Sequence, residues 1–320
     1  MANYDIFNGD ADGLCSLVQL RNAEPREATL ITGVKRDISL LKQVTAAPGD
    51  DITVLDISMD KNSEALQAAL SAGATVFYVD HHQPGTIPDS PALTAIIDEA
   101  PTVCTALLVN KHLKGAFPLW AVAGAFGDNL RDSALTLGAE LELEDTVLKT
   151  LENLGIYINY NGYGSNLEDL HFHPEALYRA IAPFGNPLGF ISDDKDTFGK
   201  LETGYHEDMG NASSLKPDSS CESSAVFMLP NEPWSRRVSG VFGNSLANDY
   251  PNRAHAIVSE GKDGTLVVSV RAPLSNRSGA GDLCKQFPTG GGRAGAAGIN
   301  HLPPEMLGEF VDAFTKQYQG

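Results

Sequence analysis

The sequence predicts an α/β protein with two domains: an N-terminal domain with a mostly parallel sheet flanked by helices, and a smaller C-terminal α/β domain, with a cleft between them. The chain of 320 residues is about twice as long as an ordinary domain. Strand-like and helix-like segments alternate up to residue 130, and a second α/β pattern begins near residue 222. We expect a first domain over residues 1–155, a helical and loop linker region over 156–221, and a second domain over 222–320.

The N-terminal half carries short apolar runs that are separated by helix-like segments. Continuous runs of this kind are typical of buried parallel strands in an α/β sheet. Residues 100–155 have a mostly helical pattern. The expected strands are Tyr4–Phe7, Thr29–Gly33, Asp51–Asp56 and Thr75–Asp80, and the expected helices are Leu14–Leu20 and Ser63–Ala72.

The stretch from 155 to 220 is rich in glycine, asparagine, serine and aspartate. We interpret it, including 159–166, as a linker and partial lid with some helix around 174–182. In the C-terminal half we expect strands at 255–259 and 265–270, a turn at 261–264, and a closing helix at 304–318.

The composition is strongly acidic, with 23 Lys+Arg against 41 Asp+Glu and a formal net charge of −18. Such a surface repels a long polyanion, because DNA binding depends on basic side chains that displace counterions. It favours a small ligand, a metal cation, or solubility alone. No apolar run is long enough for a membrane span, and the first residues lack the pattern of a signal peptide. The four scattered cysteines argue against a zinc knuckle or a disulfide scaffold, so we expect a cytoplasmic protein.

Acidic and histidine side chains follow several of the expected strands. Because parallel strands present their carboxyl ends at one edge of a sheet, we expect these side chains to lie together. Clustered carboxylates repel one another, and divalent cations relieve the repulsion; mixed carboxylate and imidazole ligands suit manganese, iron or zinc. The residues are Asn8, Asp10, Asp12, Asp56, Asp80, His81, His82 and Asp128.

Each of these motifs has a plainer interpretation when it is taken alone. The sequence from Asp10 to Gly13 is also typical of a turn or a helix cap, and an aspartate at a strand end is usually a cap. Two adjacent histidines, His81 and His82, occur in surface loops as well. The combination of the motifs, in order and at matching strand ends, favours a metal site.

The motifs Asn8–Gly13, Asp56, Asp80-His81-His82 and Gly127-Asp128 resemble the four metal-binding motifs of the DHH phosphoesterase superfamily. The segment 290–298, GGGRAGAAG, is similar to the GGGHxxAAG signature of one C-terminal domain of that superfamily. The superfamily includes the RecJ exonucleases, nano-RNases and phosphodiesterases of linear dinucleotides. The resemblance covers nearly the whole chain and is weakest between 155 and 220.

The resemblance implies two divalent ions, with Mn²⁺ expected and Mg²⁺, Co²⁺ or Fe²⁺ as alternatives. It implies that Asp10 and Asp56 hold one ion, and that Asp12, Asp56, His81 and Asp128 hold the other. As catalytic residues it implies Asp56, which bridges the ions, Asp80, which orients His81, and His82, which lies close to the scissile phosphate.

Two positions depart from the family pattern. The family usually has histidine where this chain has Asn8, and an amide oxygen is a weaker ligand for a transition metal than imidazole. The histidine of the glycine signature is replaced by Arg293, whose planar fork suits a phosphate. The first metal is therefore expected to be looser, or to arrive with substrate.

The candidate substrate-binding residues are Arg271, Gly290, Gly291, Gly292, Arg293 and Arg36. The glycines allow close approach of a ligand or form an anion nest; the alternative is a tight turn before a helix. Arg36, with Lys35, follows the second strand and reaches a phosphate, or else begins a solvated helix. Arg131 and Arg277 are weaker candidates, and His171 and His173 are interpreted as structural.

The resemblance and the charge together imply a metal-dependent phosphodiesterase that hydrolyses linear dinucleotides such as pGpG or pApA to mononucleotides by a metal-activated water. The alternatives are a RecJ-like single-strand exonuclease, which needs a basic track and aromatic platforms, a 3′-phosphoadenosine phosphatase side activity, and a nucleotide-binding protein with a weakened site. We expect a short linear nucleotide as partner, no long nucleic acid, no membrane, and a monomer or homodimer.

Overall fold

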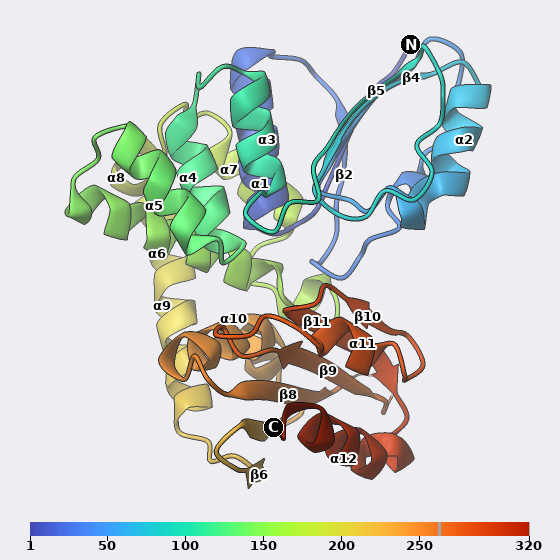
Figure 1. The fold of residues 1–320 in the computed structure, drawn as a ribbon. Coiled ribbons are helices and arrows are strands. Elements are labelled where there is room, and N and C mark those ends of the chain that lie inside the picture. Colours follow the sequence, from blue (N-terminus) through green and yellow to red (C-terminus); the bar gives the residue numbers. More distant parts are fainter. Residues whose placement is uncertain (262–263, 320) are drawn as a thin grey trace. The chain divides into compact units, whose positions relative to one another are not determined.

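The computed structural model describes residues 1–261 and 264–319 and divides into two compact units, Met1–Thr203 and Gly204–Gly320 (Figure 1). The division falls inside helix α9 (Lys195–Ser213). Both units therefore share the segment 156–221, where we expected a linker region. The turn expected at 261–264 includes Lys262 and Asp263, which lie outside the described residues.

The first unit contains a five-stranded sheet in the order β2-β1-β3-β4-β5, in which every pair of neighbours is parallel. This confirms the predicted parallel sheet and four of its strands; the fifth strand was not predicted. The strands are β1 (Asn3–Phe7), β2 (Thr29–Ile31), β3 (Asp51–Leu55), β4 (Thr75–Asp80) and β5 (Leu93–Ile97).

Helices cover both faces of this sheet. Helix α2 lies on one face, where Leu66 packs in a core with Ile52 and Val54, and α1 and α3 lie on the other (Figure 1). No helix among the described residues combines the length and the apolar character needed to cross a membrane. The helices of this unit up to α9 are α1 (Ala11–Ala23), α2 (Ser63–Ser71), α3 (Thr105–His112), α4 (Pro118–Gly127), α5 (Arg131–Glu140), α6 (Asp145–Gly162), α7 (Pro174–Ile181) and α8 (Pro187–Asp193), with 3₁₀ turns η1 (Leu41–Gln43), η2 (Asp60–Asn62) and η3 (Leu167–Asp169).

The first half of the segment 159–166 is a buried part of a helix. Residues Asn159 to Gly162 form the buried last turn of α6, and Asn161 exchanges hydrogen bonds with the backbone of Phe172 at 2.9 and 3.0 Å. The polar composition suggested a linker, but the buried Asn161 amide satisfies the N–H and C=O groups of Phe172, which need partners away from water. The end of the long helix also contacts the turn after β2, where the Gly162 carbonyl accepts a hydrogen bond from the Lys35 N–H at 2.8 Å.

The second unit contains a six-stranded mixed sheet in the order β10-β11-β9-β8-β7-β6, in which only β7 and β8 are parallel. Helix α10 lies on one face, and α11 and α12 lie on the other (Figure 1). The strands predicted near 255–259 and 265–270 and the final helix are confirmed. The elements are β6 (Ser219–Ser220), β7 (Ser224–Leu229), α10 (Pro233–Asp249), β8 (Ala254–Glu260), β9 (Leu266–Arg271), α11 (Ala280–Cys284), β10 (Gly290–Gly292), β11 (Ala296–Leu302), η4 (Pro304–Met306) and α12 (Leu307–Tyr318).

Candidate metal centre

The acidic and histidine motifs of the first unit meet at the carboxyl edge of its sheet. Two groups offer ligand atoms that lie within 4.8 Å of one another: Asp56 with His81 and His82, and Asp12 with His81 and Asp128. Asp12, Asp56 and His81 are 1%, 2% and 5% exposed. The structure therefore brings together most of the ligands that the sequence predicted, and Asp10 belongs to neither group within the described ranges.

Steric constraints explain why position 13 is a glycine. A Cβ atom on Gly13 would collide with the carbonyl oxygen of Asn8, so only glycine allows α1 to begin so soon after β1. Asp10 Oδ1 accepts a hydrogen bond from the Gly13 N–H at 3.1 Å and caps the helix. The plainer interpretation of Asp10 as a helix cap is therefore confirmed.

The Asp12 carboxylate is held by the first turn of α3. Its Oδ2 and Oδ1 accept hydrogen bonds from the N–H groups of Thr105 and Ala106 at 2.8 and 2.6 Å. Burial raises the pKa of Asp12, and Asp128 and Asp10 raise it further, against the lowering influence of His81. Sequence reasoning missed these two donors, although a threonine that opens an apolar helix was a signal for free N–H groups there.

Asp56 lies directly after β3 with a φ of +57°. This left-handed conformation is unfavourable for residues other than glycine, and such strained residues are concentrated at functional sites. Burial raises the pKa of Asp56 well above its usual range, and the neighbouring Asp10 and Asp12 raise it further. A cation near this carboxylate would offset both effects, since it favours the ionised form.

The two adjacent histidines have different partners. His81 Nδ1 donates to the Val103 carbonyl at 2.9 Å, because a carbonyl can only accept. Its Nε2 therefore faces Asp56 Oδ1 at 3.4 Å and Asp12 Oδ2 at 3.8 Å. The expectation that Asp80 orients His81 is wrong, because the Val103 carbonyl holds the His81 ring instead. The sequence around Val103 carries no motif that indicates this role.

Asp80 instead binds His82. Asp80 Oδ1 accepts from His82 Nδ1 at 2.7 Å, and Asp80 is fully buried. Burial lowers the pKa of His82, but the hydrogen bond and charge of Asp80 outweigh it, so that the net shift is upward. The His82 side chain is 38% exposed, which makes it more accessible than His81.

Lys35 lies inside the acidic cluster. Its Nζ contacts Asp10 Oδ2 at ion-pair distance, lies 3.8 Å from Asp128 Oδ1, and donates to Asn159 Oδ1 at 3.1 Å. Burial alone would lower the pKa of Lys35, but the charges of Asp10, Tyr163 and Asp128 raise it well above its usual value. Lys35 follows β2 and thus shares the sheet edge with Asp56. We had interpreted it as a phosphate contact or as the start of a solvated helix, and not as a partner of the acidic cluster.

A divalent transition metal fits this donor set. Carboxylates together with an imidazole nitrogen are typical ligands of manganese, iron or zinc. The fit is better at Asp12, Asp56, His81 and Asp128 than at Asn8. Asn8 Nδ2 donates to the Lys35 carbonyl at 3.3 Å, and its buried Oδ1 has no hydrogen-bond partner within the described ranges.

The candidate substrate residues of the second unit lie on one part of its sheet. Arg271 ends β9, as predicted, and its guanidinium donates to Asn244 Oδ1 at 2.6 Å and to Ser269 Oγ at 3.0 Å. Arg293 is exposed in the turn between β10 and β11. The structure therefore places an arginine on each of two adjoining strand ends, since Arg271 pairs with Ala296 of β11.

The triple glycine is an edge strand. Gly290, Gly291 and Gly292 form β10 and pair with β11, so neither the anion nest nor the turn before a helix is correct. An extended strand points successive N–H groups to opposite sides, whereas a nest makes them converge. A Cβ atom on Gly290 would collide with the Cys284 carbonyl, which gives this glycine a packing reason.

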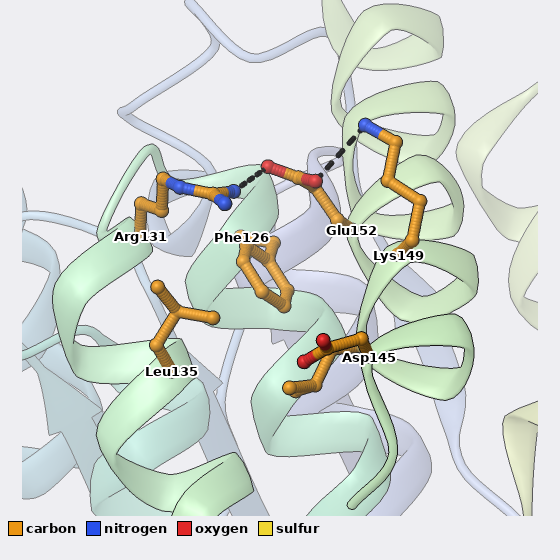
Figure 2. Close-up of a pocket in the computed structure, with 7 residues that line it drawn as sticks. Phe126, Arg131, Leu135, Asp145, Lys149 and Glu152 are labelled. Atoms are coloured by element: carbon orange, nitrogen blue, oxygen red, sulfur yellow. Dashed lines mark hydrogen bonds and ion pairs between the residues drawn. The ribbon is translucent and has the colours of Figure 1, made fainter.

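The remaining basic candidates have different surroundings. Arg36 is half-buried in the turn after β2, so the expected helix start is absent from that turn. Arg277 is exposed. Arg131 forms an ion pair with Glu152 in a hollow of about 460 Å³ between α4, α5 and α6, which also contains Lys149 (Figure 2). None of the residues that line this hollow belongs to the acidic and histidine cluster.

Two histidines were interpreted as structural. His171 Nε2 and Tyr160 Oη share a hydrogen bond of 2.7 Å. His173 caps α7, because its Nδ1 accepts from the Glu175 N–H at 3.2 Å. The partner of His171 lies in α6, and the partner of His173 lies in α7. Neither histidine belongs to the two ligand groups.

Comparison of the sequence with family models and with curated proteins finds no match. Solved structures do match. A structure of exonuclease RecJ bound to manganese is 16% identical, with a TM-score of 0.63 over 99% of this chain and 90% of that chain. RecJ from Thermus thermophilus in complex with Mn²⁺ is also 16% identical, with a TM-score of 0.63 over 98% of this chain and 51% of that chain.

A third solved structure is the pGpG-specific phosphodiesterase PggH from Vibrio cholerae. It is 17% identical, with a TM-score of 0.56 over 99% of this chain and 98% of that chain. At these identities the likeness concerns the fold, which extends over both units of this chain. The chain therefore has the same fold as exonuclease RecJ, in agreement with the fold that the sequence resemblance predicted.

Proposed function

We propose that this protein is a metal-dependent phosphodiesterase that hydrolyses linear dinucleotides or very short oligonucleotides, such as pGpG or pApA, to mononucleotides. The observation that carries the proposal is the buried cluster in which His81 Nε2 faces the carboxylates of Asp12, Asp56 and Asp128 at 3.4–3.9 Å. Manganese is the expected ion. When bound, a divalent ion would supply Lewis-acid polarisation of the phosphoryl group and lower the pKa of water.

The residues of this chain have separate tasks in that reaction. The N–H groups of Thr105 and Ala106 hold the Asp12 carboxylate in one orientation, and the Val103 carbonyl fixes the ring of His81. Fixed orientation of ligands is what a second layer of contacts gives a metal site. The ligand atoms therefore need little rearrangement before they bind a cation.

His82 is the proposed catalytic residue that touches the scissile phosphate. Its Nδ1 proton is held by Asp80, which leaves Nε2 for a phosphoryl or leaving-group oxygen. Because Asp80 favours the protonated imidazole, His82 can place positive charge where negative charge develops. Its partial exposure allows this contact, whereas His81 is 5% exposed.

The acidic surface supports the short substrate. With a net charge of −18, the chain repels a long strand more strongly than a dinucleotide. The likeness to a solved phosphodiesterase described as pGpG-specific agrees with this choice. The higher TM-scores to exonuclease RecJ favour a second candidate, a single-strand exonuclease.

The length of the substrate decides between the two candidates. We would incubate the full-length protein with Mn²⁺ and substrates from pGpG and pApA to 20-mers. His81→Asn is the inactive variant, and His206→Asn, which changes an exposed histidine of α9, is the matched control. We expect turnover to fall steeply with length and to vanish in His81→Asn alone. Faster cleavage of the 20-mers would favour the exonuclease, and no turnover of any substrate would refute both.

A further inference from the structure

The Lys35 ammonium occupies the side of the cluster where the sequence resemblance places the first metal ion. It pairs with Asp10, one of the two expected ligands of that ion, and its Nζ lies 3.8 Å from Asp128 Oδ1. Lysine carries a compact positive charge at ordinary pH. The charge that this family resemblance assigns to a metal is therefore supplied here, in part, by the protein itself.

The position of Lys35 is built by several elements. The Lys35 N–H donates to the Gly162 carbonyl at 2.8 Å, which fixes the backbone against the last turn of α6. From the same turn, Asn159 Oδ1 accepts from the ammonium at 3.1 Å, and the Tyr163 ring centroid lies 5.4 Å from Nζ. The side chain is only 23% exposed. These contacts distinguish it from a surface lysine that samples many rotamers.

Both carboxylate oxygens of Asp10, an expected ligand of the first metal, already accept hydrogen bonds. Asp10 Oδ1 accepts from the Gly13 N–H, and Asp10 Oδ2 accepts from Lys35. Asn8 stands where the family has an imidazole, and its Nδ2 donates to the Lys35 carbonyl. A divalent ion at Asp10 would also lie close to a fixed ammonium, and like charges at such distances repel strongly in a partly buried site.

We propose that this chain binds one divalent ion, at Asp12, Asp56, His81 and Asp128, and that the ammonium of Lys35 permanently replaces the first ion, the one expected beside Asp10. The inference rests on the metal site of the proposed function but not on its substrate. Lys35 neutralises Asp10 without any dependence on metal concentration. The ammonium is then a positioning group for the carboxylates.

Counting bound manganese tests this inference. The full-length protein would be loaded with Mn²⁺, freed of excess metal by gel filtration, and measured by elemental analysis and by electron paramagnetic resonance. We expect one Mn²⁺ per chain and the six-line signal of an isolated ion. Lys35→Met together with Asn8→His is expected to raise the count to two and to produce a spin-coupled signal. Lys35→Arg and Lys61→Met, which changes a 60% exposed lysine, are expected to stay at one.

Two spin-coupled ions in the wild-type protein would overturn the inference, and so would a count of one in the folded double variant. The wild-type count decides the matter even where a variant fails to fold. Nucleotide hydrolysis measured on the same samples separates the two proposals. One ion without hydrolysis refutes the proposed function alone, whereas two ions with hydrolysis refute the inference alone.

Discussion

Asp80 Oδ1 and His82 Nδ1 are joined by a hydrogen bond of 2.7 Å that ties a fully buried carboxylate to a partly exposed imidazole. The pair lies at the end of β4, directly beside His81. Through this bond the sheet fixes the ring of His82 and favours its protonated form. The neighbouring His81 is fixed differently, by a backbone carbonyl, so that two adjacent histidines have distinct tasks.

Replacing Asp80 by asparagine should remove the charge that raises the pKa of His82. With a lower pKa, His82 loses its proton at a lower pH, so the alkaline limb of kcat/KM should move to lower pH. We expect kcat to fall by about 10²-fold, the lower end of what a positioned acid or base contributes, with little change in KM.

Asp60→Asn changes an exposed carboxylate and serves as the control for Asp80→Asn. Adding His82→Ala to Asp80→Asn should cost little more, because both changes disable the same pair. Fully additive losses, or an alkaline limb that does not move, would contradict the role given to Asp80.

Arg271 tests the part that the second unit takes in substrate binding. Arg271→Met removes a guanidinium that ends β9, and loss of a charge-assisted contact of about 1.5–3 kcal/mol should raise KM by roughly 10–100-fold. The kcat should change much less. Lys285→Met, which removes an exposed cation of the same unit, is the matched control. If both variants keep the wild-type KM for pGpG, Arg271 does not bind the substrate.

The ion pair of Arg21 and Asp5 supports the sheet that carries the metal centre. Arg21 Nε and Nη2 bind the two carboxylate oxygens at 2.7 and 2.5 Å, and both side chains are buried. Arg21→Met leaves the Asp5 charge buried, with Arg26 Nη2 at 3.4 Å as its remaining ion-pair partner among the described residues. We expect a loss of about 3 kcal/mol in the free energy of unfolding by urea.

The double variant Asp5→Asn/Arg21→Met should recover part of that loss, because it removes the unpaired charge together with its partner. A loss below about 1 kcal/mol in the single variant would show that the pair behaves as an exposed one.

His255 should make the stability of the second unit depend on pH. The side chain is fully buried in β8, and burial, followed by the charge of Arg253, lowers its pKa to about 4. In the unfolded chain a histidine titrates near 6.5. The contribution is therefore fully present above about pH 6.5 and is lost as the pH falls towards about 4, by up to roughly 3 kcal/mol.

Urea unfolding of the metal-free protein between about pH 7 and about pH 4.5 measures this loss. His255→Gln cannot take up the proton and should lose less stability than the wild-type protein over the same interval. Equal losses in the two proteins would assign the pH dependence to other groups.

The hydrophobic pattern of the sequence was sufficient to predict most strands of the first unit. Apolar runs such as Thr75–Asp80 predicted buried parallel strands, and parallel strands end at one edge, so Asp56 and His81 were expected to meet there. Asp128 instead follows α4, and its place in the cluster was implied by the family resemblance. The polar segment 159–166 was interpreted as a linker, because composition alone does not show whether polar side chains are exposed to water or hydrogen-bonded in the interior. Within it, Asn161 is buried in the last turn of α6, where its amide bonds to the backbone of Phe172.

The sequence by itself determined the fold class, the sheet edge and the residues gathered at it, since these follow from hydrophobic period and strand direction. Only the tertiary structure decided which groups pair: Asp80 with His82, the Val103 carbonyl with His81, and Lys35 with Asp10. Side-chain pairing depends on rotamers and on distances of a few ångströms between distant segments, and these are set when α3, α6 and the turn after β2 pack against the same edge.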